Sequence, residues 1–175
     1  TDGSVLWANE ISGAQSFAFS ADGQTAAAGG WGKNAGLFKL ADGAIATSVK
    51  MDAVIGGVAL TPGNDLIVAV WGGTHPLFAV NQVTEKDKDG KDVSATKVVP
   101  FLISNFGFQN VIWSPKLGAL VAAEQGGKLW LVGADGKAAG MLDEEAGTTT
   151  YRMLEQNGDV LVGRMNRVVQ RLAVK

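Results

Sequence analysis

The sequence repeats one pattern four times, an apolar alternating run followed by a turn and a second apolar run. The copies occupy residues 17–28, 58–69, 111–122 and 152–163. With Phe19, Leu60, Trp113 and Leu154 as equivalent points, the copies recur about every forty residues, apart from a longer middle interval that contains the polar insertion 85–92. Such a repeat constrains the fold strongly, because each unit must bury its apolar face against its neighbours.

Each repeat is expected to form a group of short strands. The dipeptides Asp22-Gly23 and Asn157-Gly158 favour tight β-hairpins, because their residues adopt the positive φ angles that such turns need. A third apolar run follows every hairpin, and a fourth run follows the first three. The runs are short, rich in β-branched residues and broken by glycine, so the sequence predicts an all-β chain without helices.

Four-stranded repeats of this length are typical of propeller blades. The sequence therefore predicts a β-propeller of four four-stranded antiparallel blades, at residues 14–50, 55–99, 108–142 and 148–175. The last repeat stops after its third strand, and a lone apolar run at 4–9 precedes the first. We expect strand 4–9 to complete the last blade, because mixing both ends of the chain in one sheet protects an edge.

Three short motifs resemble those of a known superfamily. Ser20-Ala-Asp-Gly and Ser114-Pro-Lys are similar to its Ser-Pro-Asp-Gly turn, and Gly3-Ser-Val-Leu-Trp is similar to the outer strand of quinoprotein repeats. The chain thus resembles WD40-like and quinoprotein-like β-propellers over nearly its whole length, which implies a scaffold. The Gly-His and Trp-Asp signatures are absent, and only Trp7 fits the quinoprotein tryptophan position, so no cofactor is expected.

The blade number leaves three assemblies open. The chain is part of a longer propeller, or two copies pair into an eight-bladed ring, or four blades close alone. An open arrangement exposes apolar blade faces, which normally mark an interface. The expected partner is therefore a protein or a second propeller half, with a homo-oligomer as one form.

Composition argues against two other classes of partner. The formal net charge of −2 does not suggest a nucleic-acid-binding protein. The sequence has no run of eighteen apolar residues, so it predicts no membrane span. The chain begins at Thr1 and contains no cysteine, from which we expect a processed, extracytoplasmic protein.

Two glycine-rich aromatic loops, 29–34 and 71–76, occupy the same place in successive blades. They predict that Trp31 and Trp71 lie side by side at one rim of the propeller. One interpretation is a binding platform, because Trp faces stack on ligands, with nearby polar groups. These groups are Asn34, His75, Asn105 and Gln109. The other interpretation is that both indoles pack between blades.

The sequence predicts no catalytic residues. His75 is the only histidine, and no serine elbow or aspartate partner accompanies it. One histidine without cysteine also makes a zinc centre a poor prediction. Glu85, Asp87 and Asp89 alternate as calcium ligands do, but the bidentate glutamate of such loops is replaced by Thr96, which favours a solvated turn.

All four arginines fall in the last repeat. Arg164 and Arg167 are candidates for contacts to an anion or a partner, because guanidinium groups grip carboxylates with two hydrogen bonds. The alternative is pairing with acidic residues of the same region, among them Asp143 and Glu155.

The leading hypothesis is a non-enzymatic propeller scaffold that mediates protein–protein or subunit interaction. The second hypothesis is that the chain forms part of a quinoprotein-like oxidoreductase or hydrolase propeller whose catalytic residues lie on another segment.

Overall fold

The computed structural model describes residues 3–72, 76–102, 104, 106–143 and 149–173, and these residues form fifteen strands and no helix. The first blade contains β1 (Ala14–Phe19), β2 (Thr25–Gly30), β3 (Asn34–Lys39) and β4 (Ile45–Lys50). The second contains β5 (Ile55–Leu60), β6 (Leu66–Val70), β7 (Leu77–Lys86) and β8 (Asp92–Leu102). The third contains β9 (Phe108–Ser114), β10 (Ala119–Glu124), β11 (Leu129–Val132) and β12 (Ala138–Asp143). The fourth contains β13 (Thr150–Gln156), β14 (Asp159–Arg164) and β15 (Val169–Leu172).

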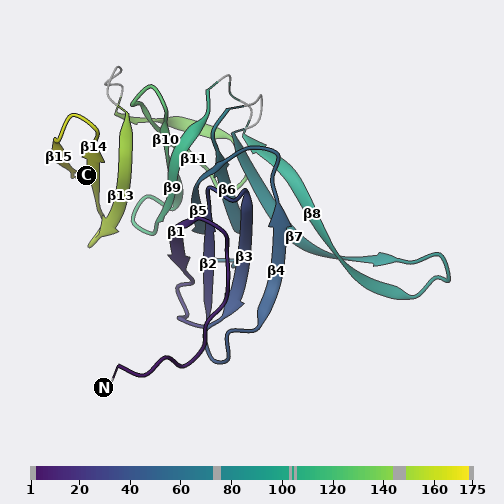
Figure 1. Cartoon of the computed structure of the whole chain (residues 1–175). Helices are drawn as coiled ribbons and strands as arrows, with labels where there is room; N and C mark the ends of the chain where they lie inside the picture. The colour runs from purple at the N-terminus through teal and green to yellow at the C-terminus, as the bar shows by residue number, and fades with distance from the viewer. Residues whose placement is uncertain (1–2, 73–75, 103, 105, 144–148, 174–175) are drawn as a thin grey trace.

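Each sheet is an antiparallel meander whose strands pair in chain order. The innermost strands β1, β5, β9 and β13 contact one another in that order, so the blades fan out from a common centre (Figure 1). This arrangement confirms the predicted β-propeller of four blades. Three sheets have four strands, and the fourth has three.

The core lies between consecutive blades rather than within one layer. One apolar cluster joins the first blade to the second, another joins the second to the third, and the last joins the third to the fourth. Strands β5 and β6 are buried along their full length because they face a neighbouring blade on both sides. Among the described residues, β13 and β1 make no contact as extensive as those between neighbouring innermost strands, so the arc of blades is open.

The sequence predicts that residues 4–9 complete the last blade, and within one molecule they lie elsewhere. These residues form no strand, and they lie against the first blade. The Trp7 ring stacks on the Phe38 ring with centroids 6.5 Å apart, and the Trp7 Nε1 group donates a hydrogen bond to the Leu40 carbonyl at 2.9 Å. Asn9 donates to the Gly43 carbonyl at 2.6 Å. These contacts hold the segment at the end of the arc opposite β15.

A β-bulge recurs at one position in all four blades. The register between the innermost strand and the second strand shifts by one residue near the start of the innermost strand. The residues left without a partner are Gln15, Gly56, Gln109 and Tyr151. Counting from this bulge corrects one sequence equivalence, because Glu155 rather than Leu154 matches Phe19.

The hairpin turns between the first and second strands follow the predicted chemistry. The Ser20 hydroxyl donates to the Asp22 carboxylate at 2.6 Å, and the Gln24 backbone N–H donates to it at 3.0 Å. These two hydrogen bonds, in that order of effect, lower the pKa of the Asp22 carboxyl below its usual 3.8. Gly23 takes the positive φ of 67° that the turn requires.

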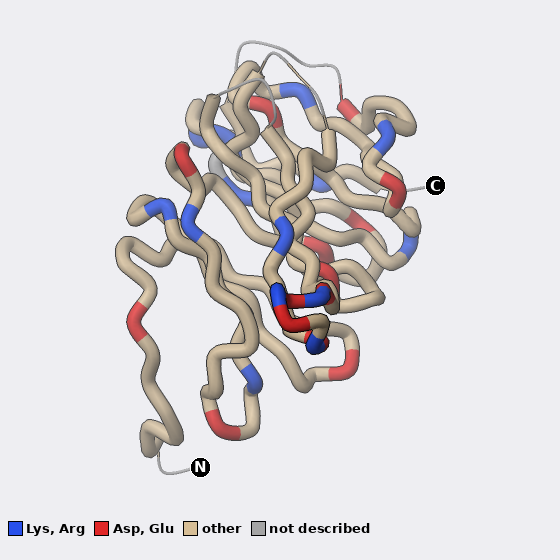
Figure 2. Tube along the Cα trace, turned by 90° about the vertical axis from the view of Figure 1, so that its right-hand side faces the viewer, with Lys and Arg blue, Asp and Glu red and all other residues tan. Residues whose placement is uncertain are grey.

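The polar insertion forms a long two-stranded ribbon, because β7 and β8 continue to pair beyond the sheet as far as Lys86 and Asp92. Figure 1 shows the ribbon projecting away from the blades. Lysines alternate with Asp and Glu along its tip (Figure 2). Glu85 pairs with Lys97 across the ribbon at 2.6 Å.

Candidate functional site

One backbone hydrogen bond recurs at the same rim of every blade. The residue that follows the second strand donates its N–H to the carbonyl of the loop that precedes the innermost strand. The pairs are Trp31 to Gly13 at 3.0 Å, Trp71 to Val54 at 2.9 Å, Gln125 to Gly107 at 2.9 Å and Met165 to Thr149 at 3.0 Å. This bond defines four equivalent rim positions, which are Trp31, Trp71, Gln125 and Met165.

Trp31 and Trp71 lie side by side, as their spacing predicts. Their ring centroids are 5.8 Å apart with an interplanar angle of 61°, an edge-to-face contact. Trp31 is 60% exposed. Its Nε1 group donates to the Gln15 side-chain oxygen, and the Gln15 amide nitrogen donates to the Ile55 carbonyl at 3.0 Å. Trp31 is therefore an exposed indole whose orientation is fixed by both the first and the second blade.

Trp71 is less exposed than Trp31, because the bulge residue of the second blade is Gly56. A Cβ at Gly56 would lie 2.5 Å from the Trp71 Nε1 atom and 2.6 Å from the Gln109 carbonyl oxygen. The missing side chain thus makes room for the Trp71 indole between the second and third blades. Within the described part of the chain, the buried Trp71 Nε1 group has no hydrogen-bond partner. Trp71 thus packs between blades, whereas Trp31 is exposed at the rim.

The remaining rim candidates divide into two groups. Asn34 begins β3, and Gln109 is the half-buried bulge residue of β9. His75 and Asn105 lie outside the described residues. Phe106, which the sequence did not single out, is 55% exposed beside Gly107, whose backbone approaches Trp71.

Arg164 and Arg167 have different surroundings. Arg164 is only 5% exposed, and its guanidinium donates to Asp143 at 2.5 Å, to Gln170 at 2.7 Å and to the Gly127 carbonyl at 3.0 Å. It therefore ties the fourth blade to the third. Arg167 is exposed in the β14–β15 turn, where its φ is 68°.

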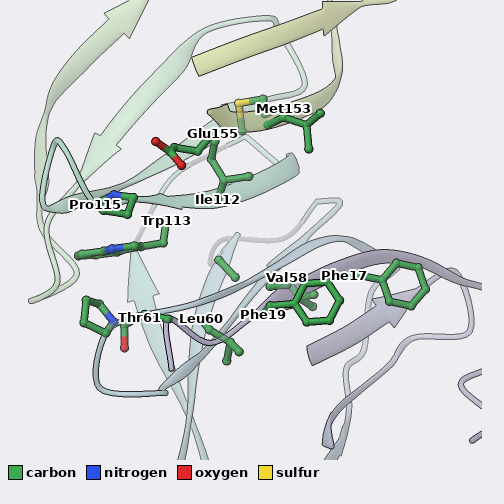
Figure 3. Close-up of a pocket in the computed structure, with 15 residues that line it drawn as sticks. Phe17, Phe19, Val58, Leu60, Thr61, Ile112, Trp113, Pro115, Met153 and Glu155 are labelled. Carbon is green, nitrogen blue, oxygen red and sulfur yellow. The ribbon is translucent and has the colours of Figure 1, made fainter. Parts of the chain in front are cut away.

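The innermost strands line an apolar groove of about 420 Å³ at the centre of the arc. Figure 3 shows Phe17 and Phe19 on one side of it and Met153 on another, with Ile112 and Trp113 between them. The polar side chains of the groove are those of Thr61 and Glu155. Nothing in this lining resembles a nucleophile with a base, so the groove offers apolar contact rather than acid–base chemistry.

The carboxylates of two of the three candidate calcium ligands, Glu85 and Asp87, have partners within the ribbon. Glu85 is paired with Lys97, and the Asp87 carboxylate accepts the backbone N–H groups of Asp89 at 2.9 Å and Lys91 at 2.8 Å. No group of three His, Cys, Asp or Glu residues that could hold a metal ion occurs among the residues that the structure describes.

In the described part of the chain, two carboxyl groups have lowered pKa values, and both lie in turns at the other end of the blades from the rim. They are Asp22, discussed above, and Asp135. The backbone N–H of Lys137 donates to Asp135 at 3.0 Å and lowers the pKa of its carboxyl, with a smaller effect from the Lys137 side chain. Hydrogen bonding in the turns explains both shifts.

The sequence did not identify Gln15 or Met165 as rim residues. Gln15 occupies a bulge, and a bulge is defined by the pairing of two strands, which the sequence of one strand does not show. Met165 is 66% exposed at the fourth rim position. The sequence could have indicated Met165, because it follows the second strand of the fourth repeat, and the first two repeats have tryptophan at that position.

Comparisons with known proteins show the fold and no family. No protein-family model matches the chain, and no curated protein matches it. The β-propeller domain of Cps50 (Swd1) from Myceliophteria thermophila is similar with a TM-score of 0.66 and 16% identity, over 90% of this chain and 51% of that one. The computationally designed protein Ika4 is similar with a TM-score of 0.66 and 10% identity, over 99% of both chains. The chain thus spans about half the length of the first of these chains and nearly the whole length of the second.

No helix in the described residues is long and apolar enough to cross a membrane.

Proposed function

We propose that this protein is a non-enzymatic, WD40-like propeller scaffold that binds a protein partner through its rim. The observation that carries the proposal is Trp31, a large aromatic side chain that is 60% exposed yet held in one orientation by Gln15 and Trp71. An ordered, exposed indole loses little conformational entropy on binding, which is why tryptophan is enriched among the residues that dominate protein interfaces.

The neighbouring rim positions support a partner that presents apolar side chains. Met165 is 66% exposed, and the loop residue Phe106 is 55% exposed. Met adapts its shape to different apolar surfaces. The rim therefore combines a rigid aromatic anchor with adaptable apolar contacts, and the similarity to a natural β-propeller domain is consistent with such a role.

The test uses a displayed peptide library as the probe. The immobilised chain selects peptides, and the affinity of each selected peptide is then measured for wild type and for Trp31→Ala by fluorescence anisotropy. We expect Trp31→Ala to lower affinity at least about tenfold, as truncation of a dominant interface tryptophan does. The melting temperature should change little, because most of the indole is exposed.

The matched control is Val93→Ala, which truncates an apolar side chain, 41% exposed, in the ribbon away from the rim. It should leave the affinity of every selected peptide unchanged. The rim proposal fails when the library yields no binders, or when Trp31→Ala binds the selected peptides as tightly as Val93→Ala does.

A further inference from the structure

The last blade has an exposed apolar face where the other blades have a buried one. Val169 in β15 pairs with the second strand at the register position held by Ala35, Leu77 and Leu129 in the other blades. Those three residues are 0% exposed, whereas Val169 is 77% exposed. In the first three blades, this face packs on the next blade. The face of the fourth blade lacks such a neighbour in this structure.

The first blade shows the complementary feature on its opposite face. Phe17 in β1 is equivalent by register to Val58, Val111 and Met153, which are buried against the preceding blade with 2%, 0% and 4% exposure. Phe17 is 64% exposed. The two ends of the arc therefore expose the two kinds of face that consecutive blades bury against each other.

Residues 4–9 lie where the outer strand of a preceding blade would lie. Trp7 covers Phe38, and Phe38 is equivalent by register to Val80, which is buried in the cluster between the first and second blades. The segment also leads into β1 at the end of the blade from which β4 leads into β5. It thus has the position and direction of a fourth strand, antiparallel to a third strand such as β15.

The segment and the last blade each lack what the other offers. Val5 and Leu6 are 80% and 87% exposed, and the segment pairs with no strand. Among the described residues, the sheet β13–β14–β15 has no fourth strand, so no described strand pairs with the outer edge of β15. Such an edge readily accepts a further strand. Within one molecule, the segment lies against the first blade, at the other end of the open arc from β15.

We propose that two copies of this chain join head to tail into an eight-bladed ring, in which residues 4–9 of each copy form the fourth strand of the other copy's last blade. Each junction buries the open face of a fourth blade against the open face of a first blade, so one two-fold axis relates both junctions. This proposal concerns the two ends of the arc and does not depend on the rim.

Two observations favour a second copy as the occupant. The chain spans 51% of the natural propeller domain that it resembles, so two such arcs are enough to close a ring. The designed protein matches it over 99% of both chains, which shows that an arc of this extent also occurs as a protein chain of its own. A second copy supplies both the missing strand and the missing blade face.

The test measures the mass of residues 1–175 in solution by light scattering coupled to size-exclusion chromatography. We expect wild type to have twice the 18.1 kDa mass of the chain. Val169→Asp should have the mass of one chain and an unchanged circular dichroism spectrum, because this side chain is exposed in the single molecule. The matched control Val93→Asp, in the ribbon, should remain a dimer.

Strand exchange can be tested separately with an engineered disulfide, because the chain has no cysteine of its own. Val5→Cys and Arg171→Cys variants, mixed, unfolded, refolded and oxidised, should form a disulfide-linked dimer that contains one copy of each, since both side chains are exposed in the single molecule. A monomeric wild type would overturn the proposal and assign the open faces to further blades of a longer chain. A larger oligomer, a dimer that Val169→Asp leaves intact, or a dimer without the mixed disulfide would overturn the proposed ring.

Discussion

Arg164 is the residue whose surroundings most clearly assign it a structural role. Its guanidinium is buried and donates hydrogen bonds to a carboxylate, an amide and a backbone carbonyl. Two of these acceptors, Asp143 and Gly127, belong to the third blade, so a polar contact reinforces the apolar cluster between the last two blades. The loss of one partner from such a pair leaves a buried charge without compensation.

Replacement of Arg164 is therefore expected to destabilise the protein. Arg164→Met should lower the free energy of unfolding by about 3 kcal/mol or more, because it leaves Asp143 and Gly127 without their donor. Urea denaturation followed by circular dichroism measures the change.

Arg171 provides the control for this prediction. It pairs with Asp159, but its side chain is 72% exposed. Arg171→Met should therefore cost less than about 1 kcal/mol in the same urea denaturation. Equal losses for the two variants would show that the Arg164 contacts do not stabilise the fold.

At the scale of elements, the ribbon formed by the ends of β7 and β8 projects from its blade and adds no fully buried side chain to the core. Its side chains beyond Gln82 are exposed or half-buried, and its ion pairs lie at the surface. Surface ion pairs contribute little to stability.

A shortened ribbon should leave the fold intact. Replacement of residues 84–94 by Asn-Gly joins Val83 to Ala95, which are direct partners in the antiparallel register, through a two-residue turn. The melting temperature should change by less than about 3 °C, since less than about 1 kcal/mol is involved. Differential scanning calorimetry checks this, and a fall of more than about 10 °C would mean that the ribbon supports the blades.

The strands were predictable where local chemistry decides the structure. Alternating apolar runs and Asp-Gly or Asn-Gly turns indicated the hairpins, and the structure has strands there. The course of residues 4–9 was not predictable, because a strand pattern does not reveal its partner. The bulges were hidden for a related reason, since an extra residue in one strand leaves the apolar alternation of the other unchanged.

For the candidate site, repeat spacing alone was enough to place Trp31 beside Trp71. It could not show which indole is exposed, because that depends on the residue at the bulge of each blade. Gln15 orients Trp31 from beside it, whereas Gly56 leaves a space that Trp71 fills. Contacts between segments distant in the sequence decide such differences.

At the scale of the whole molecule, burial falls from strands that lie between two blades to strands at the outer side of a blade. Strands β5 and β6 are entirely buried, whereas the outer strand β12 is mostly exposed. Regions with fewer buried contacts open locally at a lower free energy than the core does.

Hydrogen exchange should follow this gradient. We expect the backbone amides of β5 and β6 to exchange most slowly and those of β12 to exchange much faster, because opening β12 exposes little apolar surface. Mass spectrometry of exchanged peptides measures both. Equal rates in these strands would indicate that the blades open only together.

The recurring bulge also bears on how such a protein can diversify. A residue outside the ladder can be exchanged without loss of a ladder hydrogen bond of its own blade, and the four blades already carry Gln15, Gly56, Gln109 and Tyr151 there. Two of these positions have further contacts, because Gln15 donates to the Ile55 carbonyl and the neighbouring indole occupies the space beside Gly56. The surface chemistry of this rim can therefore evolve one blade at a time on an unchanged frame.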